Sequence, residues 1–334
     1  MRTIAVLGAG SWGTAIAVHL GRLGHDVRLW ARDARLVAEI RERRANAVYL
    51  PDVTLPSSVS VTSELEAALR GIDVVVSAIP SHGLRTVMRS AAPHFRARAI
   101  VVSATKGLES GSLMRMSEVI SAEIGPEHEV VVLSGPSFAS EVALQLPTVV
   151  VAASASGAAA DLVQEEFRGP SLRLYGSTDV TGVEIGGAMK NVIAIAAGVV
   201  EGLGLGHNAL AALITRGLAE ISRLACAAGG QRETTAGLSG LGDLVLTCTG
   251  GLSRNRHVGI ELARGRRLSD IVASMKMVAE GVNTTRAGTA LGARYGVELP
   301  ITTQMAAVLD GRSDVRAAVE ALMMRRQRSE AEIG

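Results

Sequence analysis

The chain opens with TIAVLGAGSWG at residues 3–13, a short apolar run that leads into a glycine-rich turn. The apolar run is typical of a strand buried on both faces, and helical periodicity follows at residues 14–23. Gly-x-Gly-x-x-Gly between a strand and a helix is the spacing of dinucleotide-binding folds, although alone it also occurs in ordinary turns. Here Gly8 would form the tight turn, Gly10 would let the backbone approach a pyrophosphate, and Gly13 would allow close helix packing. Its place after the first strand predicts a nucleotide site with its phosphates at the helix N-terminus.

More strand-like runs alternate with helical patterns through the first half of the chain. Continuous apolar strands of this kind favour a parallel sheet with helical crossovers. After residue 176 the pattern becomes Ala-rich and Leu-rich and almost free of β-branched runs. We therefore predict an α/β architecture: a doubly wound Rossmann-type domain over residues 1–178, followed by an all-helical C-terminal domain over residues 179–334. The strands are expected at residues 3–7, 27–30, 74–78, 99–103, 130–133 and 148–152.

Composition narrows the class of protein. The 334 residues include 34 Lys and Arg against 32 Asp and Glu, a net charge of +2, which gives no basic field for nucleic acid. Two well-separated cysteines, Cys226 and Cys248, indicate neither a metal site nor a disulfide framework and favour a reducing cytoplasm. The longest apolar helical stretch expected, residues 192–200, is shorter than the ~20 residues that cross a bilayer. We expect no membrane insertion, and a homodimer through the helical domain is left open.

The end of the second strand bears on cofactor choice. An NAD-preferring site carries an acid there for the ribose 2′-hydroxyl, whereas this chain has Arg32 followed by Asp33. A guanidinium at Arg32 would bind a 2′-phosphate, so NADP(H) is preferred and NAD(H) remains usable because of the adjacent acid. The alternative is that Arg32 is only the first of several solvated charges that continue to Arg44.

Candidate chemical groups lie in the second half. Lys190 belongs to the otherwise apolar stretch 183–192, where a charged amine is costly unless it has partners or a function. A structural lysine at a helix end is the alternative. The segments GLGDLVLT at 240–247 and SRNR at 253–256 add an acid, hydroxyls, an amide and two guanidiniums, a set typical of an anion pocket.

At these residues the chain resembles the bacterial NAD(P)-dependent glycerol-3-phosphate dehydrogenase family. The glycine fingerprint is shared with many dehydrogenases, but Lys190-Asn191 combined with Gly242-Asp243 and Ser253-Arg254-Asn255 is specific to this family. Further matching segments lie in order along nearly the whole chain: TKGL at 105–108, SGPSFA at 134–139, LITRG at 213–217 and EGV at 280–282. His207 departs from the family pattern, which more often has Asp or Asn there.

The resemblance implies reduction of dihydroxyacetone phosphate to sn-glycerol 3-phosphate, a precursor of glycerophospholipids. It implies that Lys190 is the catalytic acid/base. Carried over by motif position, the substrate would be bound by Lys106, Gly135, Ser137, Lys190, Asp243, Ser253, Arg254 and Asn255. The cofactor would be bound by Gly10, Ser11, Trp12, Gly13, Arg32, Tyr49, Lys106, Ala139, Arg254, Val278 and Glu280.

Two other functions compete with this one. A β-hydroxyacid or 6-phosphogluconate type of dehydrogenase also joins a dinucleotide domain to helices with a catalytic lysine. The Ser253-Arg254-Asn255 block favours the small phosphorylated ketone over those substrates. A regulatory protein that binds NADP(H) without turnover is the third hypothesis, because fold alone never proves catalysis. The presence of Lys190, Asp243 and Arg254 together argues against it.

Overall fold

The computed structural model describes residues 1–275, 277–327 and 329, and the chain forms two compact units. The first unit comprises residues 1–105 and 116–180. The second comprises residues 106–115 together with the described residues from 181 onward. The sequence-based division between residues 178 and 179 kept residues 106–115 with the first domain. In the structure this short segment packs with the helices, because its Leu108 is part of their hydrophobic core.

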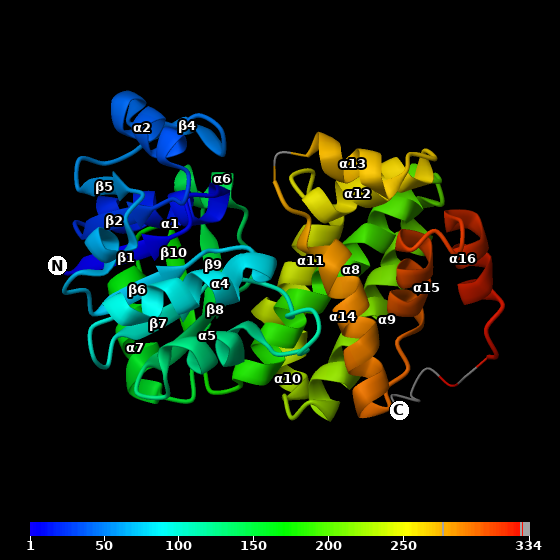
Figure 1. Cartoon of the computed structure of the whole chain (residues 1–334). Helices are drawn as coiled ribbons and strands as arrows, with labels where there is room; N and C mark the ends of the chain where they lie inside the picture. The colour runs from blue at the N-terminus through cyan, green and yellow to red at the C-terminus, as the bar shows by residue number, and fades with distance from the viewer. Residues whose placement is uncertain (276, 328, 330–334) are drawn as a thin grey trace. The chain divides into compact units, whose positions relative to one another are not determined.

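An eight-stranded sheet forms the centre of the first unit (Figure 1). Its order is β10-β9-β8-β7-β6-β1-β2-β5, and every neighbouring pair is parallel except β8 and β9. The Rossmann-type fold is thus confirmed. The expected parallel sheet is found except at β8 and β9, which pair antiparallel. The strands are β1 (Thr3–Leu7), β2 (Asp26–Trp30), β5 (Val59–Thr62), β6 (Val74–Ser77), β7 (Ile100–Ser103), β8 (Glu129–Ser134), β9 (Thr148–Ala153) and β10 (Leu172–Ser177).

Both faces of this sheet are buried, which explains the continuous apolar runs in its strands. Val74 and Val76 of β6 join a core that includes Ile16 of the first helix, and Val75 between them is buried on the opposite face. The helices around the sheet are α1 (Ser11–Arg22), α2 (Ala34–Arg43), α3 (Leu65–Leu69), α4 (Ser81–Ala91), the 3-10 helix η1 (Ala92–His94), α5 (Met116–Ile124), α6 (Ala139–Ala143) and α7 (Gly157–Phe167). A separate hairpin pairs β3 (Ala45–Asn46) with β4 (Leu50–Thr54).

Strand order reverses at β1, since β2 lies on one side of it and β6 on the other. In an open α/β sheet the ends of the two strands at such a point leave a crevice where nucleotides bind. The glycine-rich turn begins directly after β1, at this point of the sheet. The topology therefore places the turn where a dinucleotide site is expected.

The second unit is helical, as expected for the C-terminal domain. Its helices are α8 (Val180–Gly202), α9 (Gly206–Ala227), α10 (Arg232–Ala236), the π-helix η2 (Leu238–Gly242), α11 (Asp243–Thr249), α12 (Arg254–Ala263), α13 (Leu268–Ser274), α14 (Glu280–Tyr295), α15 (Pro300–Leu309) and α16 (Val315–Met323).

Helix α8 is the core helix of the second unit. It has 23 residues and is much longer than the apolar stretch expected from the sequence. Length and composition alone would let it cross a membrane, but its most apolar 18-residue window is completely buried inside the protein. Burial on all sides explains a helix that is apolar all round.

Candidate active site

Three glycines shape the turn after β1 for three different reasons. Gly8 has φ of 111°, and a Cβ there would lie 2.7 Å from the carbonyl oxygen of Ala78. A Cβ at Gly13 would overlap the carbonyl oxygen of Gly8, so this glycine permits helix α1 to pack against the turn. A Cβ at Gly10 would meet nothing within 4 Å. Packing therefore requires glycine at Gly8 and Gly13, whereas Gly10 leaves the backbone open to an approaching group.

Asn46 connects the small hairpin to this turn. Its side chain is fully buried and donates from Nδ2 to the carbonyl oxygen of Ala9 and to Oγ1 of Thr14, both at 2.9 Å. Its Oδ1 accepts from the backbone N–H of Tyr49 at 3.3 Å. Through these bonds Asn46 ties half-buried Tyr49 to the glycine-rich turn. Ser11 and Trp12 are the first two residues of α1, which follows that turn.

The structure separates the roles of the two charged residues after β2. Asp33 is the N-cap of α2 and accepts from the backbone N–H of Arg35 at 2.8 Å. Arg32 is exposed next to it. The carboxylate is thus committed to the helix terminus, where its negative charge also complements the helix dipole.

Gly135, Ser137 and Ala139 follow β8 in the first unit. Gly135 has φ of 138°, and a Cβ there would come within 3.0 Å of the backbone of Val150. Oγ of Ser137 donates to the carbonyl oxygen of Gly135 at 2.9 Å, and Ala139 is the first residue of α6. Helix α6 packs against α1, the helix that begins at the glycine-rich turn.

In the second unit, Gly186 and Lys190 lie one turn apart on α8 and face the segment that carries Asp243. A Cβ at Gly186 would be 2.9 Å from the carbonyl oxygen of Ser239 in the π-helix η2. The absence of a side chain lets η2 approach, and residues four apart share a face of the helix. Lys190 therefore reaches Asp243, which directly follows η2. A short π-helix at this place agrees with the frequent location of such helices at functional sites.

Lys190 is held by two acceptors in a nearly solvent-free environment. Its Nζ donates to Oδ1 of Asp243 at 2.5 Å and to Oγ1 of Thr247 at 2.7 Å. Thr247 in turn donates to the carbonyl oxygen of Asp243 at 2.6 Å, so its lone pair faces the ammonium. The second oxygen of Asp243 accepts from Nζ of Lys106 at 2.5 Å. Two lysines thus share one carboxylate, whose side chain is only 1% exposed.

The central lysine of this cluster has a lowered pKa. Burial lowers the pKa of Lys190 to about 8, the Asp243 carboxylate opposes that shift, and the Lys106 ammonium adds to it. The formal sum of two ammonium groups and one carboxylate is one positive charge. Cys248 also lies near Lys190, but burial raises the pKa of its thiol to about 12, so it stays neutral near pH 7. The cluster is therefore a cationic, proton-donating centre.

Ser253, Arg254 and Asn255 start helix α12. Ser253 is its N-cap and accepts from the backbone N–H of Arg256 at 3.2 Å, while the Arg254 side chain is exposed. Nδ2 of Asn255 donates to Oδ1 of Asn191, the residue after Lys190, at 2.9 Å. Oδ1 of Asn255 accepts from the N–H of residue 281 at 3.0 Å. Asn255 thus joins α8, α12 and α14.

Val278 and Glu280 stand just before and at the start of α14. Val278 is 36% exposed, and Glu280 lies close enough to Arg254 for the two charges to attract. The sequence analysis gave no individual role to Thr247, Asn191, Arg115 or Glu184, although Thr247 and Asn191 stood in its motifs. Thr247 is four residues after Asp243, a spacing that puts both on one helix face, and this signal was present in the sequence. For the other three, the partners lie far away along the chain.

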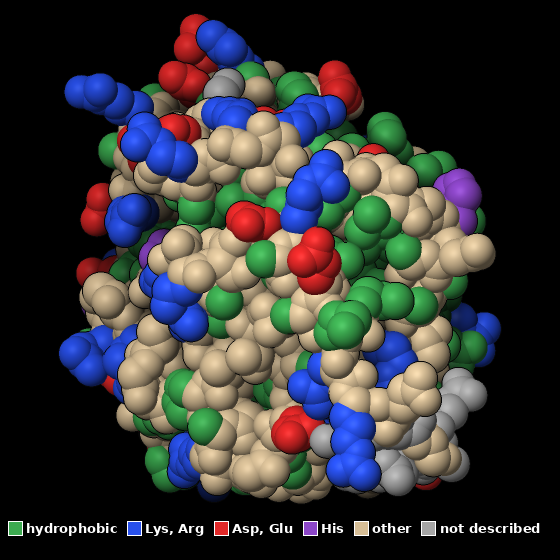
Figure 2. All heavy atoms as spheres, turned by 90° about the vertical axis from the view of Figure 1, so that its right-hand side faces the viewer, with side chains coloured by type: hydrophobic (Ala, Val, Ile, Leu, Met, Phe, Trp, Pro, Cys, Tyr) green, Lys and Arg blue, Asp and Glu red, His purple; other side chains and the backbone are tan. Residues whose placement is uncertain are grey.

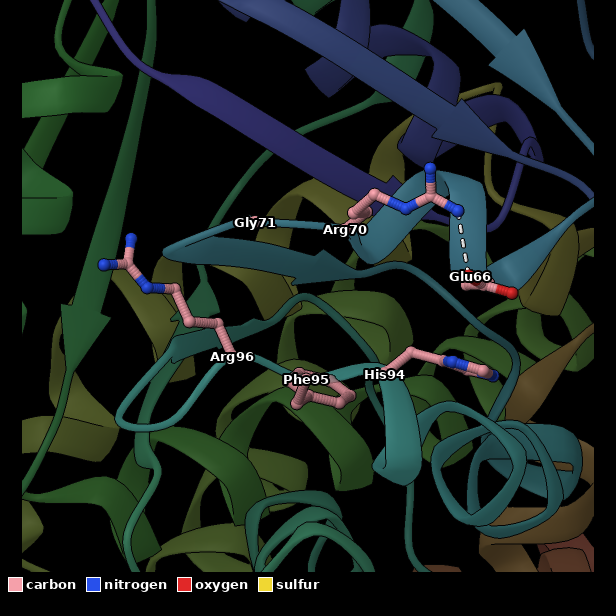
Figure 3. Close-up of a pocket in the computed structure, with 6 residues that line it drawn as sticks. All are labelled: Glu66, Arg70, Gly71, His94, Phe95 and Arg96. Atoms are coloured by element: carbon pink, nitrogen blue, oxygen red, sulfur yellow. Dashed lines mark hydrogen bonds and ion pairs between the residues drawn. The ribbon is translucent and has the colours of Figure 1, made fainter.

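The predicted site residues fall into two sets. The first unit contains the glycine-rich turn, Arg32, Tyr49, Gly135, Ser137 and Ala139, and the second contains the lysine cluster, Ser253 to Asn255, Val278 and Glu280. A separate hollow at the amino ends of β6 and β7 is lined by Arg70, Phe95 and Arg96 (Figure 3). Its arginines form exposed ion pairs, with Glu66 and Asp73 respectively. This hollow lies where the strands begin, whereas the glycine-rich turn lies where β1 ends. The hollow is therefore no part of the site.

A Rossmann-type unit combined with a helical unit that buries a lysine beside a carboxylate is the arrangement of a nicotinamide-dependent dehydrogenase. Family models for the N-terminus and C-terminus of NAD-dependent glycerol-3-phosphate dehydrogenase match residues 3–160 and 179–320. The chain belongs to the glycerol-3-phosphate dehydrogenase family and is an oxidoreductase.

Relatives named glycerol-3-phosphate dehydrogenase [NAD(P)+] agree over almost the full length. That of Koribacter versatilis is 54% identical over 97% of this chain and 98% of its own, and that of Geobacter sulfurreducens is 52% identical over 98% of each. The crystal structure of glycerol-3-phosphate dehydrogenase from Coxiella burnetii superposes with a TM-score of 0.93 at 40% identity and covers 97% of this chain and 99% of its own.

Proposed function

We propose that this chain reduces dihydroxyacetone phosphate to sn-glycerol 3-phosphate, with NADPH as the preferred hydride donor and NADH as a usable one. The observation that carries the proposal is the buried Lys190, held between Asp243 and Thr247 with a lowered pKa. A lysine in this state suits proton exchange near neutral pH better than a structural cap does. The cluster of Lys190, Lys106 and Asp243 carries a net positive charge, which suits an anionic substrate.

The residues of the first unit fit a dinucleotide. The open backbone at Gly10 and the start of α1, which has no side-chain cap, suit a pyrophosphate contacted by Gly10, Ser11, Trp12 and Gly13. Tyr49 and Ala139 are proposed neighbours of the cofactor, as are Lys106, Arg254, Val278 and Glu280 of the second unit. Arg32 would bind the 2′-phosphate, because Asp33 is occupied as a helix cap.

Lys190 acts as the general acid of the reduction. Bound NADPH supplies the hydride that goes to the carbonyl carbon of the substrate. Asp243 and Thr247 take two of the three ammonium hydrogens, and the third is directed to the carbonyl oxygen. As negative charge grows on that oxygen, Lys190 stabilises it and transfers a proton, and the resulting amine regains a proton from water. In the reverse reaction the neutral amine accepts the proton of the alcohol.

Arg254 is the proposed phosphate ligand. Its exposed guanidinium lies at the first turn of a ten-residue helix, where the backbone N–H groups also favour an anion. The Ser253 hydroxyl accepts a backbone N–H and keeps its own hydrogen for a phosphate oxygen. Asn255 holds the local framework through Asn191 and residue 281. Gly135 and Ser137 of the first unit complete the proposed set, and Lys106 contributes positive charge.

The test is a spectrophotometric assay of the purified chain with NADPH and three acceptors: dihydroxyacetone phosphate, unphosphorylated dihydroxyacetone, and 2-keto acids. Each charge-assisted contact to the phosphate contributes ~1.5–3 kcal/mol, so kcat/KM for the phosphorylated ketone should exceed that for dihydroxyacetone by more than about tenfold per contact. 6-Phosphogluconate with NADP+ is the comparison for the competing dehydrogenase class. Equal rates with and without the phosphate would reject the proposal, as would preference for a hydroxyacid.

The cellular setting is proposed to be the cytoplasm, where the product enters glycerophospholipid synthesis. The free cysteines, exposed Cys226 and buried Cys248, suit a reducing compartment. The nearly balanced charge of the chain, +2, is what supports the proposal of no nucleic-acid partner. Figure 2 shows basic and acidic side chains interspersed with apolar ones on one face. A homodimer through the helical unit is the proposed assembly, and light scattering of the purified chain tests it.

A further inference from the structure

The segment 106–115 forms a closed loop on the helical unit. Its ends approach each other through an antiparallel bridge between Leu108 and Arg115. Within it the N–H of Glu109 donates to the carbonyl oxygen of Met114 at 2.9 Å. Leu108 is 1% exposed and belongs to the core around α8. Lys106 begins this loop and Arg115 ends it, so the position of one end depends on that of the other.

Arg115 forms an ion pair with a buried carboxylate on α8. Its Nη1 donates to Oε2 of Glu184 at 2.8 Å, and the two side chains are 21% and 3% exposed. A carboxylate at this depth is strongly destabilising without a partner. Glu184 precedes Lys190 by six residues, or about 9 Å along the helix axis, and lies on another side of it. The pair is therefore outside the cluster formed by Lys190 and Asp243.

We propose that the Arg115–Glu184 ion pair is a positioning device that holds loop 106–115 on α8 and thereby keeps the Lys106 ammonium on Asp243. The inference rests on the proposed function, since it assigns both residues to the same reaction without contact with the substrate. Helix α8 thus carries both Lys190 and Glu184, and Glu184 holds the loop that begins with Lys106. Loss of the anchor would let Lys106 move, and a misplacement of ~1 Å can lower a rate by about 10².

The inference predicts a specific effect on proton transfer. Because the Lys106 ammonium lowers the pKa of Lys190, a displaced Lys106 raises that pKa. We expect Glu184→Gln and Arg115→Gln to lower kcat/KM for dihydroxyacetone phosphate by about tenfold to a hundredfold. The alkaline fall of kcat/KM should move to higher pH in both variants, as it should in Lys106→Met. Arg115→Lys, which keeps the charge, should restore part of the loss.

The decisive experiment combines these variants with Lys106→Met. If the ion pair acts through Lys106, Glu184→Gln has little further effect on kcat/KM and none on the pH profile in the Lys106→Met background. Fully multiplicative losses, or an unmoved alkaline limb in Glu184→Gln, would overturn the proposal. Glu261→Gln is the matched control, because Glu261 is also a nearly buried carboxylate paired with arginines, Arg264 and Arg266. It should leave kcat/KM and the profile unchanged.

Two further measurements separate this inference from simpler explanations. Circular dichroism and the NADPH dissociation constant report whether each variant is folded, and Arg115→Gln serves where Glu184→Gln is unfolded. If neither single variant folds, Arg115→Lys must still show an upward shift of the alkaline limb, and a profile identical to wild type would reject the inference. Failure of the wild-type chain to reduce dihydroxyacetone phosphate would reject the proposed function instead.

Discussion

Lys190 and Lys106 donate to opposite oxygens of the same carboxylate, that of Asp243, each at 2.5 Å. The three charged groups lie close together where little water can screen them, and both the Asp243 carboxylate and the Lys106 ammonium act on the pKa of Lys190. Two lysines about one carboxylate leave an excess positive charge, and Lys190 also donates to Oγ1 of Thr247. In the proposed mechanism Lys190 is the proton donor and Lys106 is a supporting cation.

The pH dependence of the reduction follows from the pKa of Lys190. The ammonium form is required, so kcat/KM should be constant below about pH 8 and fall above it. Asp243→Asn removes a charge that favours the ammonium, so the fall should begin at lower pH. Lys106→Met removes a repelling charge, and the fall should begin at higher pH. Rates measured with NADPH across pH 6–10 check the opposite directions, and shifts of the same sign in both variants would contradict the assignment.

Cofactor choice should depend on Arg32 and not on Asp33. Arg32→Ala removes a contact of ~1.5–3 kcal/mol to the 2′-phosphate, so KM for NADPH should rise by about tenfold to a hundredfold while KM for NADH changes little. The difference should shrink at high salt, since the guanidinium is exposed. Equal losses for both cofactors would mean that Arg32 serves another purpose.

Asp33→Ala is the companion variant. Because Asp33 accepts from the N–H of Arg35, its loss should lower the free energy of unfolding by ~0.5–2 kcal/mol and leave the ratio of the two cofactors' KM values nearly unchanged. Chemical denaturation and steady-state kinetics measure the two effects. A large gain in NADPH preference would show that the carboxylate acts on the ribose after all.

A buried carboxylate elsewhere in the helical unit gives a prediction for stability. Glu220 accepts from the N–H of Ile301 at 2.6 Å and from Thr302 at the start of α15, yet burial dominates and raises its pKa to about 7. The folded chain thus binds this proton more tightly than the unfolded chain does. Its stabilising contribution is complete below about pH 4.5 and is lost as the pH rises toward 7.

Glu220→Gln keeps an oxygen acceptor but removes the titration. Relative to the variant, the wild-type free energy of unfolding should fall by ~1–3 kcal/mol between pH 5 and 7.5. Urea denaturation of both proteins at several pH values measures the difference. Parallel pH curves would show that Glu220 is ionised in the folded chain throughout this range.

The local signals in the sequence predicted much of the first unit, including the parallel direction of most of its strands. The strands around β1 and β6 were found because they are buried on both faces and bounded by turns. β5 and β10 were missed, because at the edges of the sheet their residues alternate between buried and exposed. The antiparallel pairing of β8 with β9 was not foreseen either, since an apolar strand carries no mark of its direction.

In the site, too, the features encoded by short local motifs were predicted, and those that depend on contacts between distant residues were not. The glycine fingerprint, Lys190 and Asp243 were recognisable because each stands in a short motif. The sharing of Asp243 by two lysines depends on contacts between residues 53 and 137 positions apart, which no local pattern encodes. The anchoring of the Lys106 loop by Glu184 likewise appears only once the loop has packed on α8. The close packing of Gly186 against η2 and of Gly198 against α12 likewise depends on residues far away along the chain.

The phosphate-binding assignment predicts a loss mainly in substrate binding, with a smaller effect on the cofactor because Arg254 is also proposed to contact it. Arg254→Ala should raise KM for dihydroxyacetone phosphate by about tenfold or more, since a charge-assisted contact contributes ~1.5–3 kcal/mol. Activity with unphosphorylated dihydroxyacetone, low in both proteins, should change little. Arg264→Ala is a suitable comparison, because Arg264 pairs with Glu261 at the other end of α12 and its loss should leave KM nearly unchanged. An unaltered KM in Arg254→Ala would place the phosphate at other residues.

The most direct test of the central claim is the rate of a single turnover of NADPH with dihydroxyacetone phosphate in Lys190→Ala. Asp243 keeps Lys106 as a partner in this variant, so the cluster should remain folded. We predict that hydride transfer slows by ~10²–10⁴, the usual contribution of general acid catalysis, while the NADPH dissociation constant stays within a few-fold of wild type. A single-turnover rate within a few-fold of wild type would contradict the assignment of Lys190 as the proton donor.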